Sequence, residues 1–147
     1  MLKRWGADRY AELAVLLKER GLKNVVLLGG PDDQEECARI ASRCGGGWLV
    51  NLCGQTRILD IVPLCAVARL IVANDTGTAH VASCTPTPMV VICGPTDPRR
   101  VKPVGNNVRA LQADIDCINC YLKGCSHHSC MKMITPRMVL GTLSGSL

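Results

Sequence analysis

Short apolar runs alternate with helical patterns along the chain, and this order restricts the fold more than any other feature. The apolar runs cover residues 25–28, 48–52, 69–74 and 88–93, with a weaker fifth run at 108–111. Such continuous runs are typical of strands buried on both faces of a parallel sheet. Helical patterns fall between them, at residues 9–20, 33–43, 56–64 and 77–84. With right-handed crossovers, this order predicts one α/β domain with a Rossmann-like, doubly wound parallel sheet.

Three helix boundaries are specific enough to test. Asp8 is expected to cap the first helix, and Thr135 followed by Pro136 is expected to open the last one. Pro63 falls inside the third helical pattern, so it either kinks that helix or marks a later start.

The segment from Leu70 to His80 predicts a ligand site. Its apolar run ends in Asn-Asp-Thr-Gly before a helix start, which places the turn at the carboxyl edge of the sheet, where open α/β sheets bind ligands. The free N–H groups of Thr76, Gly77 and Thr78 suit a phosphate, whereas the Asp75 carboxylate suits the hydroxyls of a sugar. A second interpretation is that Asp75 and Thr76 only cap the helix.

Composition narrows the class of partner. The chain has 147 residues, 48% hydrophobic and 20% charged, as in globular domains, and no apolar run has the length of a membrane span. Its net charge of +5 favours an anionic ligand or an anionic membrane surface. Aromatic residues make up only 3%, which argues against a nucleic-acid reader built on stacking. Without a signal sequence after Met1, a reducing cytoplasmic location is expected.

Five ordered segments resemble the C-terminal half of the bacterial lipopolysaccharide heptosyltransferases, glycosyltransferase family nine. Lys3-Arg4-Trp5 resembles the Lys-x-Trp motif that opens this half, and Asn74-Asp75-Thr76-Gly77 with His80 matches the central Asp-Ser/Thr-Gly-x-x-His motif. The others are Leu28-Gly29-Gly30 with Asp33 and Glu35, Asn51 to Thr56, and Gly94 to Pro98 followed by Ile134-Thr135-Pro136. The chain departs from the family at Gly6, where proline is common, and at Thr78, where proline or an apolar residue is common.

The resemblance implies the donor-binding half of a two-domain GT-B enzyme, which moves heptose from ADP-heptose to the lipopolysaccharide inner core. The N-terminal acceptor domain, with its catalytic acidic residue, is expected to precede Met1, so residues 1–147 are expected to hold no catalytic residue. The acceptor would be a lipid-linked core oligosaccharide at the inner membrane surface. A fixed cation and helix N–H groups can stabilise a departing diphosphate, so no cofactor is required.

Carried over by position, the resemblance gives each site residue a role. Lys3 would contact the diphosphate, Glu35 the ribose, and Asp75 the heptose, while the backbone of Thr76 and Gly77 would hold phosphates. Each role has a structural alternative. Lys3 could be a solvated terminal residue, Glu35 a helix-dipole charge, and His80 a core hydrogen-bonding residue. Trp5 is expected to be a packing anchor rather than a ligand platform.

The ten cysteines fall into two groups. Six are scattered singly through predicted elements, as small buried apolar residues would be: Cys37, Cys44, Cys53, Cys65, Cys84 and Cys93. Four cluster in a loop predicted at about residues 114–132, together with His127 and His128: Cys117, Cys120, Cys125 and Cys130. The cluster could hold free thiols, disulfides, or a zinc ion or iron–sulfur cluster that orders the loop.

Two functions from other classes stay open beside the glycosyltransferase hypothesis. The chain could be a nucleotide or nucleotide-sugar binding module without catalysis, or a small metal-binding interaction domain built on the cysteines. A preference for adenine nucleotides would favour the glycosyltransferase.

Overall fold

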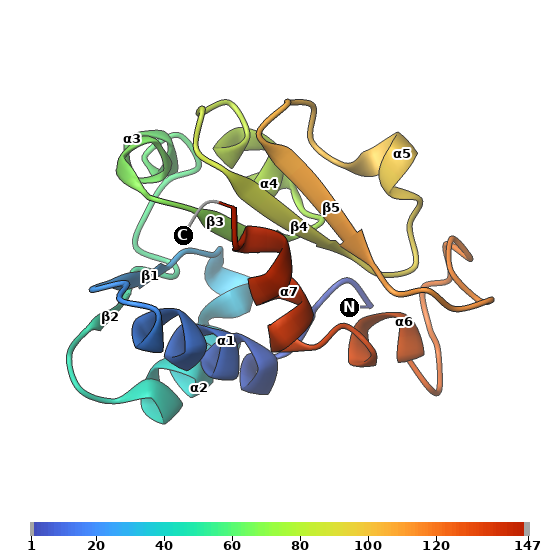
Figure 1. Cartoon of the computed structure of the whole chain (residues 1–147), viewed down its shortest axis with the longest axis horizontal. Helices are drawn as coiled ribbons and strands as arrows, with labels where there is room; N and C mark the ends of the chain where they lie inside the picture. The colour runs from blue at the N-terminus through green and yellow to red at the C-terminus, as the bar shows by residue number, and fades with distance from the viewer. Residues whose placement is uncertain (1, 146–147) are drawn as a thin grey trace.

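The computed structural model describes residues 2–145 and places parallel strands among flanking helices (Figure 1). In chain order the elements are α1 (Ala7–Glu19), β1 (Val25–Leu27), η1 (Pro31–Asp33), α2 (Gln34–Cys44), β2 (Leu49–Asn51), α3 (Ile61–Val67), β3 (Ile71–Asn74), α4 (Gly77–Ala82), β4 (Met89–Cys93), α5 (Pro98–Val101), β5 (Val108–Gln112), α6 (Ser129–Lys132) and α7 (Pro136–Leu143). The predicted alternation of strands and helices is confirmed. The short elements η1, α5 and α6 were not predicted, because one turn of helix leaves no periodic pattern.

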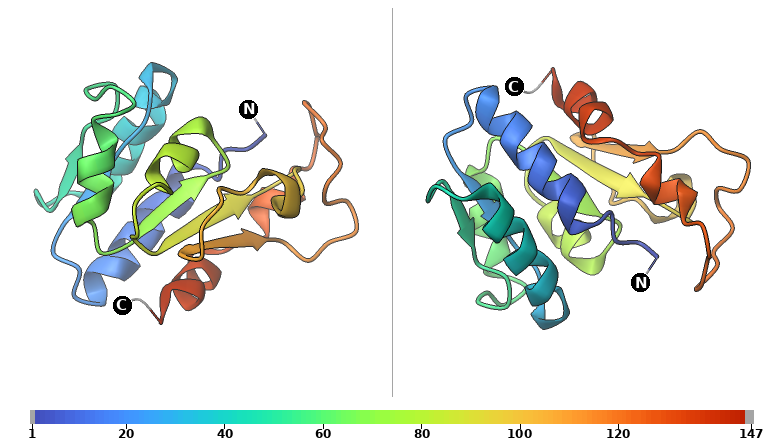
Figure 2. Two further views of the ribbon diagram at one scale, coloured as in Figure 1. Left: turned by 90° about the horizontal axis from the view of Figure 1, so that it is seen from above. Right: turned by 90° about the horizontal axis from the view of Figure 1, so that it is seen from below.

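All strand pairs are parallel, as predicted, but the hydrogen-bonded ladder is in two parts. β1 pairs with β2, and β3, β4 and β5 form a second sheet in that order. Views from above and from below show the helices on either side of these strands (Figure 2). The architecture is therefore Rossmann-like, with its strands in two separate hydrogen-bonded ladders.

The core forms on the two faces of β4, whose five residues are all buried. Side chains on a strand alternate between faces. Val90 and Ile92 pack in one cluster with Leu13 of α1 and Val139 of α7. Met89, Val91 and Cys93 pack in a second cluster, with residues of α3 and α4. Full burial of each large apolar side chain stabilises the fold by about 1.5–3 kcal/mol, so β4 holds the two layers together.

The prediction that residues 25–28 form a buried strand is wrong in one respect. Val26 of β1 and Val50 of β2 are 46% and 45% exposed. The cause is the position of the helices: α2 packs against β2 and α1, whereas α3 packs against α4. One face of the β1–β2 pair is therefore less covered than the faces of β4.

Two predicted helix starts are corrected and one is confirmed. α1 begins at Ala7 after Gly6, whose φ of 105° is closed to proline, and Asp8 lies in the first turn instead of capping. The third helix begins at Ile61 rather than at Thr56, so Pro63 marks a late start and sits in the first turn, where proline is tolerated. At α7, the Thr135 hydroxyl accepts a hydrogen bond from the Met138 amide at 3.2 Å, as predicted.

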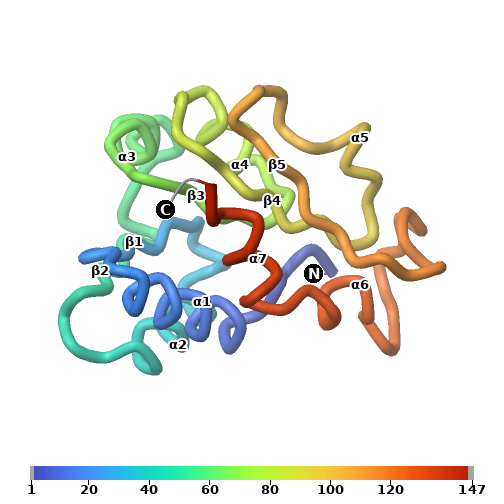
Figure 3. Tube along the Cα trace, in the orientation of Figure 1, coloured from blue at the N-terminus to red at the C-terminus, as the bar shows by residue number. Residues whose placement is uncertain are grey.

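The Cα trace shows the segment between β5 and α6 as a long loop that projects beyond the strands (Figure 3). Within residues 2–145, none of the helices has the length and apolar character that a membrane crossing requires.

Candidate functional site

Three turns meet at one edge of the strands, because parallel strands present their carboxyl ends on the same side. β1 leads into Gly29 and Gly30, β3 into the turn at Asp75 and Thr76, and β4 into Gly94 and the residues after it. The N-terminal segment from Lys3 to Trp5 lies against two of these turns through the hydrogen bonds described below. The predicted site residues near Asp75 and at Lys3 are thus brought together, although they lie far apart in the sequence.

Asp75 is buried and binds two side chains from other segments. Its Oδ2 atom accepts a hydrogen bond from Lys3 Nζ at 2.6 Å and another from Thr96 Oγ1 at 3.0 Å. The Asp75 side chain is 4% exposed, whereas that of Lys3 is 34% exposed. Lys3 is therefore neither a solvated terminal residue nor a fully buried one. An ammonium group has three donors, so Lys3 can hold Asp75 and still offer donors to a ligand.

Asn74 fixes the turn from the other side. Its Oδ1 atom accepts hydrogen bonds from the Trp5 amide at 3.2 Å and from the Tyr10 hydroxyl at 3.0 Å. Trp5 is 1% exposed and donates through Nε1 to the Ile134 carbonyl at 2.8 Å, which confirms it as a packing anchor. Burial raises the pKa of Tyr10 well above its usual value, with the Glu36 charge adding to the effect. The phenol therefore stays a donor to Asn74 at neutral pH.

The turn itself is open to the outside. Thr76 is the N-cap of α4 by backbone conformation, but its side chain makes no capping hydrogen bond. Because the Asp75 side chain binds Lys3 and Thr96, the interpretation that Asp75 and Thr76 only cap the helix is wrong. Gly77 is exposed, and a Cβ added there would meet no atom within 4 Å, so the fold itself does not require glycine. His80 is also exposed, which excludes the core role considered for it.

At the neighbouring turn, the structure adds Glu36 to the two acidic residues that the sequence motif named, Asp33 and Glu35. Glu35 is exposed in the first turn of α2. Arg4 instead binds Asp33 at 2.7 Å and Glu36 at 3.3 Å. The Asp33 carboxylate also accepts a hydrogen bond from the Gly30 amide at 3.1 Å. Glu36 was foreseeable only from helix phase, since it lies beside the buried Cys37 while Glu35 points outward.

Glycine is required at Gly29. A Cβ there would lie 2.9 Å from both the Asp33 Cβ and the Cys53 Sγ atoms, which is too close for real contacts. One Glu36 oxygen, Oε1, is buried without a hydrogen-bond partner. The turn after β1 is thus tightly packed, with one acceptor left unused beside Arg4.

The turn after β4 contains a further ion pair. Asp97 caps α5 and binds Arg99 through both carboxylate oxygens, at 3.0 Å and 2.7 Å, which lowers the pKa of Asp97. Within the core, burial raises the pKa of Cys93 to about 12, and the Asp75 charge adds to the effect. The Cys93 thiol therefore stays protonated and acts as an apolar core residue.

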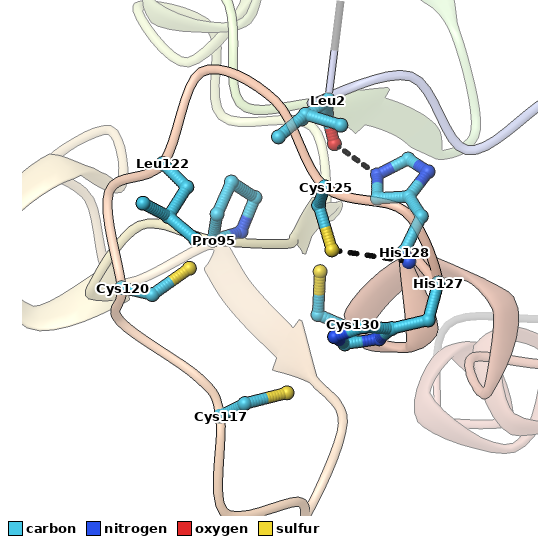
Figure 4. A pocket seen from close by; sticks show the side chains of 9 residues that line it. All are labelled: Leu2, Pro95, Cys117, Cys120, Leu122, Cys125, His127, His128 and Cys130. Carbon is cyan, nitrogen blue, oxygen red and sulfur yellow. Dashed lines mark hydrogen bonds between the residues drawn. The ribbon is translucent and has the colours of Figure 1, made fainter.

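The cysteines divide largely as predicted. Of the six scattered ones, Cys37, Cys53, Cys65 and Cys93 are buried and Cys44 is half-buried, but Cys84 is exposed, because it lies just past the end of α4. The four clustered cysteines line one pocket of about 50 Å³, together with His127 and His128 (Figure 4). All ten are free thiols. Over residues 2–145, no three metal-binding side chains are close enough to share an ion.

Known proteins with similar sequences are heptosyltransferases. The chain is 34% identical to lipopolysaccharide heptosyltransferase 2 of Salmonella typhimurium over 99% of its own length and 43% of the relative's. It is 30% identical to lipooligosaccharide heptosyltransferase 2 of Haemophilus influenzae, over 97% of this chain and 42% of that protein. The chain therefore spans less than half the length of these curated relatives.

Solved structures and a family model agree with these similarities. The structure of E. coli ADP-heptose LPS heptosyltransferase II matches with a TM-score of 0.81 and 32% identity, over 97% of this chain and 41% of that one. E. coli heptosyltransferase WaaC with ADP matches in fold, with a TM-score of 0.77 at 23% identity, over 99% of this chain and 40% of that one. The model described as glycosyltransferase family 9 (heptosyltransferase) matches residues 1–131. On these grounds, the chain belongs to glycosyltransferase family 9.

Proposed function

We propose that this chain is the donor-binding domain of a heptosyltransferase, which holds ADP-heptose while the sugar passes to a lipopolysaccharide core acceptor. The observation that carries the proposal is the Lys3–Asp75 pair at the carboxyl edge of the strands, with the cation partly open to solvent and the carboxylate buried. Similarity to heptosyltransferases, and to an E. coli relative solved with ADP, supports the choice of ligand.

The geometry suggests how the site would divide the donor. Lys3 would interact with the diphosphate, and Asp75 would accept hydrogen bonds from heptose hydroxyls. The backbone at the exposed Thr76 and Gly77 and at the half-buried Thr78 would approach the phosphates, with His80 beside them on α4. Glu35 would reach the ribose from the first turn of α2.

Besides binding the donor, this domain would assist the transfer by stabilising the leaving group. As the bond from the sugar to the diphosphate breaks, negative charge develops on the departing phosphate oxygens. A lysine held in place by Asp75, which Thr96 holds in turn, stabilises that charge without having to reorganise. In this proposal the base that activates the acceptor belongs to the preceding domain, and the acceptor is met at the inner membrane surface. The domain alone would then bind ADP weakly and transfer no sugar.

Calorimetry on the purified chain tests the assignment of Lys3. Lys3→Ala should lower the affinity for ADP at least tenfold and leave adenosine almost unaffected, because only ADP carries charge for Lys3. The loss should shrink as salt rises, since an exposed ion pair is screened over roughly 8–10 Å. Lys23→Ala is the matched control, because Lys23 is an exposed lysine outside the site.

The same titrations separate the competing functions. Binding of UDP as tightly as ADP would favour a general nucleotide-binding module over a heptosyltransferase domain. Equal losses of ADP and adenosine in Lys3→Ala would mean that Lys3 only packs the fold, and would refute its proposed role.

A further inference from the structure

The cysteine loop, residues 117–130, carries more thiols, which are soft metal ligands, than core packing accounts for. The side chains of Cys117, Cys120, Cys125 and Cys130 all line the same pocket (Figure 4). Cys117 and Cys120 are exposed, Cys125 is half-buried and Cys130 is buried. Two exposed thiols add nothing to a hydrophobic core, so packing does not explain the cluster.

The backbone of the cysteine loop is held in an unusual conformation. Within residues 2–145, the non-glycine residues with positive φ are Asn119, Tyr121 and His128, at 57°, 54° and 51°. All three lie in the cysteine loop, and two of them flank Cys120. Left-handed backbone at non-glycine residues is uncommon and gathers at ligand-binding sites. The positive φ angles set the course of this loop on both sides of Cys120 and directly before Ser129.

One thiol is held in place by a backbone hydrogen bond. The His128 amide donates a hydrogen bond to Cys125 Sγ at 3.3 Å. This contact fixes the direction of the Cys125 side chain within the pocket. Each histidine ring has one nitrogen engaged: His127 Nδ1 with the Ser129 hydroxyl, and His128 Nε2 with the Leu2 carbonyl. The four sulfurs are the softest donors that line the pocket.

We propose that Cys117, Cys120, Cys125 and Cys130 bind one Zn²⁺ ion in a closed, structural tetrathiolate site. Four thiolates in tetrahedral arrangement are the set that zinc prefers in structural sites. With Zn–S bonds of about 2.3 Å, the sulfurs must come to about 3.8 Å from one another. In the described part of the chain no three ligands have yet come that close. The exposed half of the loop, at Cys117 and Cys120, closes over Cys125 and Cys130 when the ion binds.

The position of the site indicates what the zinc ion would do. The His128 ring binds the carbonyl of Leu2, the residue before Lys3, and the Tyr121 amide donates to the Pro95 carbonyl at 2.9 Å. Pro95 precedes Thr96, which binds Asp75. The cysteine loop thus contacts both segments that converge on the Lys3–Asp75 pair. Zinc binding would make the cysteine loop rigid and so position this pair.

Metal titration of the full chain tests the site directly. Reduced protein stripped with a chelator should take up one equivalent of Zn²⁺. One equivalent of Co²⁺ should give thiolate charge-transfer absorption that Zn²⁺ abolishes. Hydrogen exchange should slow in residues 117–128 and at Lys3 when zinc is added. None of these readouts needs a nucleotide, so they can succeed or fail independently of the proposed donor site.

Matched variants make the outcome decisive. Losing an outer partner of a metal site costs about 10–100-fold in affinity, so removing a ligand with Cys117→Ser or Cys120→Ser should cost more than 100-fold. Both thiols are exposed, so the fold should survive, which circular dichroism checks. Cys84→Ser, at an exposed thiol outside the loop, should leave zinc binding unchanged.

Three results would overturn the proposal. The first is reduced protein that takes up no stoichiometric metal. The second is a Co²⁺ complex without thiolate absorption. The third is equal zinc affinity in Cys117→Ser and Cys84→Ser. If the oxidised protein forms disulfides within the loop and the reduced protein takes up no metal, the cysteines have a redox role instead of a zinc-binding one.

Discussion

The Lys3–Asp75 pair should respond asymmetrically to removal of its two partners. Lys3→Met keeps the aliphatic stem but leaves the Asp75 carboxylate, 4% exposed, with the Thr96 hydroxyl as its remaining side-chain donor. Asp75→Asn keeps an oxygen that can accept from Thr96 and leaves an ammonium group that is 34% exposed and can turn to water. Losing the lysine should therefore destabilise the fold more than neutralising the aspartate.

The magnitudes follow from this difference in exposure. Breaking a fully buried ion pair costs about 3–5 kcal/mol, but here water can reach the vacated lysine position, so we expect about 2–3 kcal/mol for Lys3→Met. Asp75→Asn loses the charge on one hydrogen bond, which costs about 1 kcal/mol. The coupling energy from the double mutant should be about 1–2 kcal/mol, since exposed pairs give only about 0.2–1 kcal/mol.

Urea denaturation of the four proteins in the cycle measures these quantities. The exposed pair Arg57–Asp60, with side chains 88% and 41% exposed, supplies the control cycle, and its coupling should be smaller. In thermal melts, Lys3→Met should lower Tm by about 4–12 °C, given about 2–4 °C per kcal/mol in a domain of this size. A cost for Asp75→Asn that equals or exceeds that of Lys3→Met would refute the reasoning from exposure.

Three further results are expected. Asp75→Ala should weaken binding of ADP-heptose about 10–100-fold more than binding of ADP, because one charged hydrogen bond to the sugar is worth about 1.5–3 kcal/mol; equal losses in calorimetry would contradict the sugar contact. The raised pKa of Tyr10 means that its contribution to stability is complete below about pH 10, the pKa of tyrosine in the unfolded chain, and is lost as pH rises further. The free energy of unfolding, measured by denaturation, should therefore fall more steeply with alkaline pH in the unaltered chain than in Tyr10→Phe. Thr135→Ala should lower the free energy of unfolding by about 1 kcal/mol, whereas Thr142→Ala, inside α7, should cost less.

Local sequence patterns were enough to predict most elements and to indicate the turn at Asp75 as a candidate site. Continuous apolar runs located β3 and β4, and Thr135 with Pro136 located the start of α7. These features depend on residues close together in the chain, through side-chain periodicity and end capping. They can therefore be predicted without knowledge of the fold. The turn at Asp75 was also predicted, because parallel strands always bring their carboxyl ends to one edge.

What the sequence could not provide is the set of partners across the chain. Lys3 and Asp75 lie 72 positions apart, and Arg4 meets the start of α2 from 29 positions away. Such pairs depend on the path of the whole backbone, about which local periodicity carries no information. The same limit explains why the Arg4–Glu36 contact was not predicted, why Asp8 does not cap α1, and why Val26 is exposed, which depends on where α3 packs.

The cysteine loop shows the division most clearly. The sequence placed four thiols within fourteen residues but could not say whether they meet. The tertiary structure turned them toward one pocket and attached the loop to Leu2, next to Lys3, and to Pro95, next to Thr96, which binds Asp75. Thus the sequence by itself determined the elements and their chemistry. Only the folded chain decided which charges meet, because burial and long-range contact are properties of three-dimensional packing.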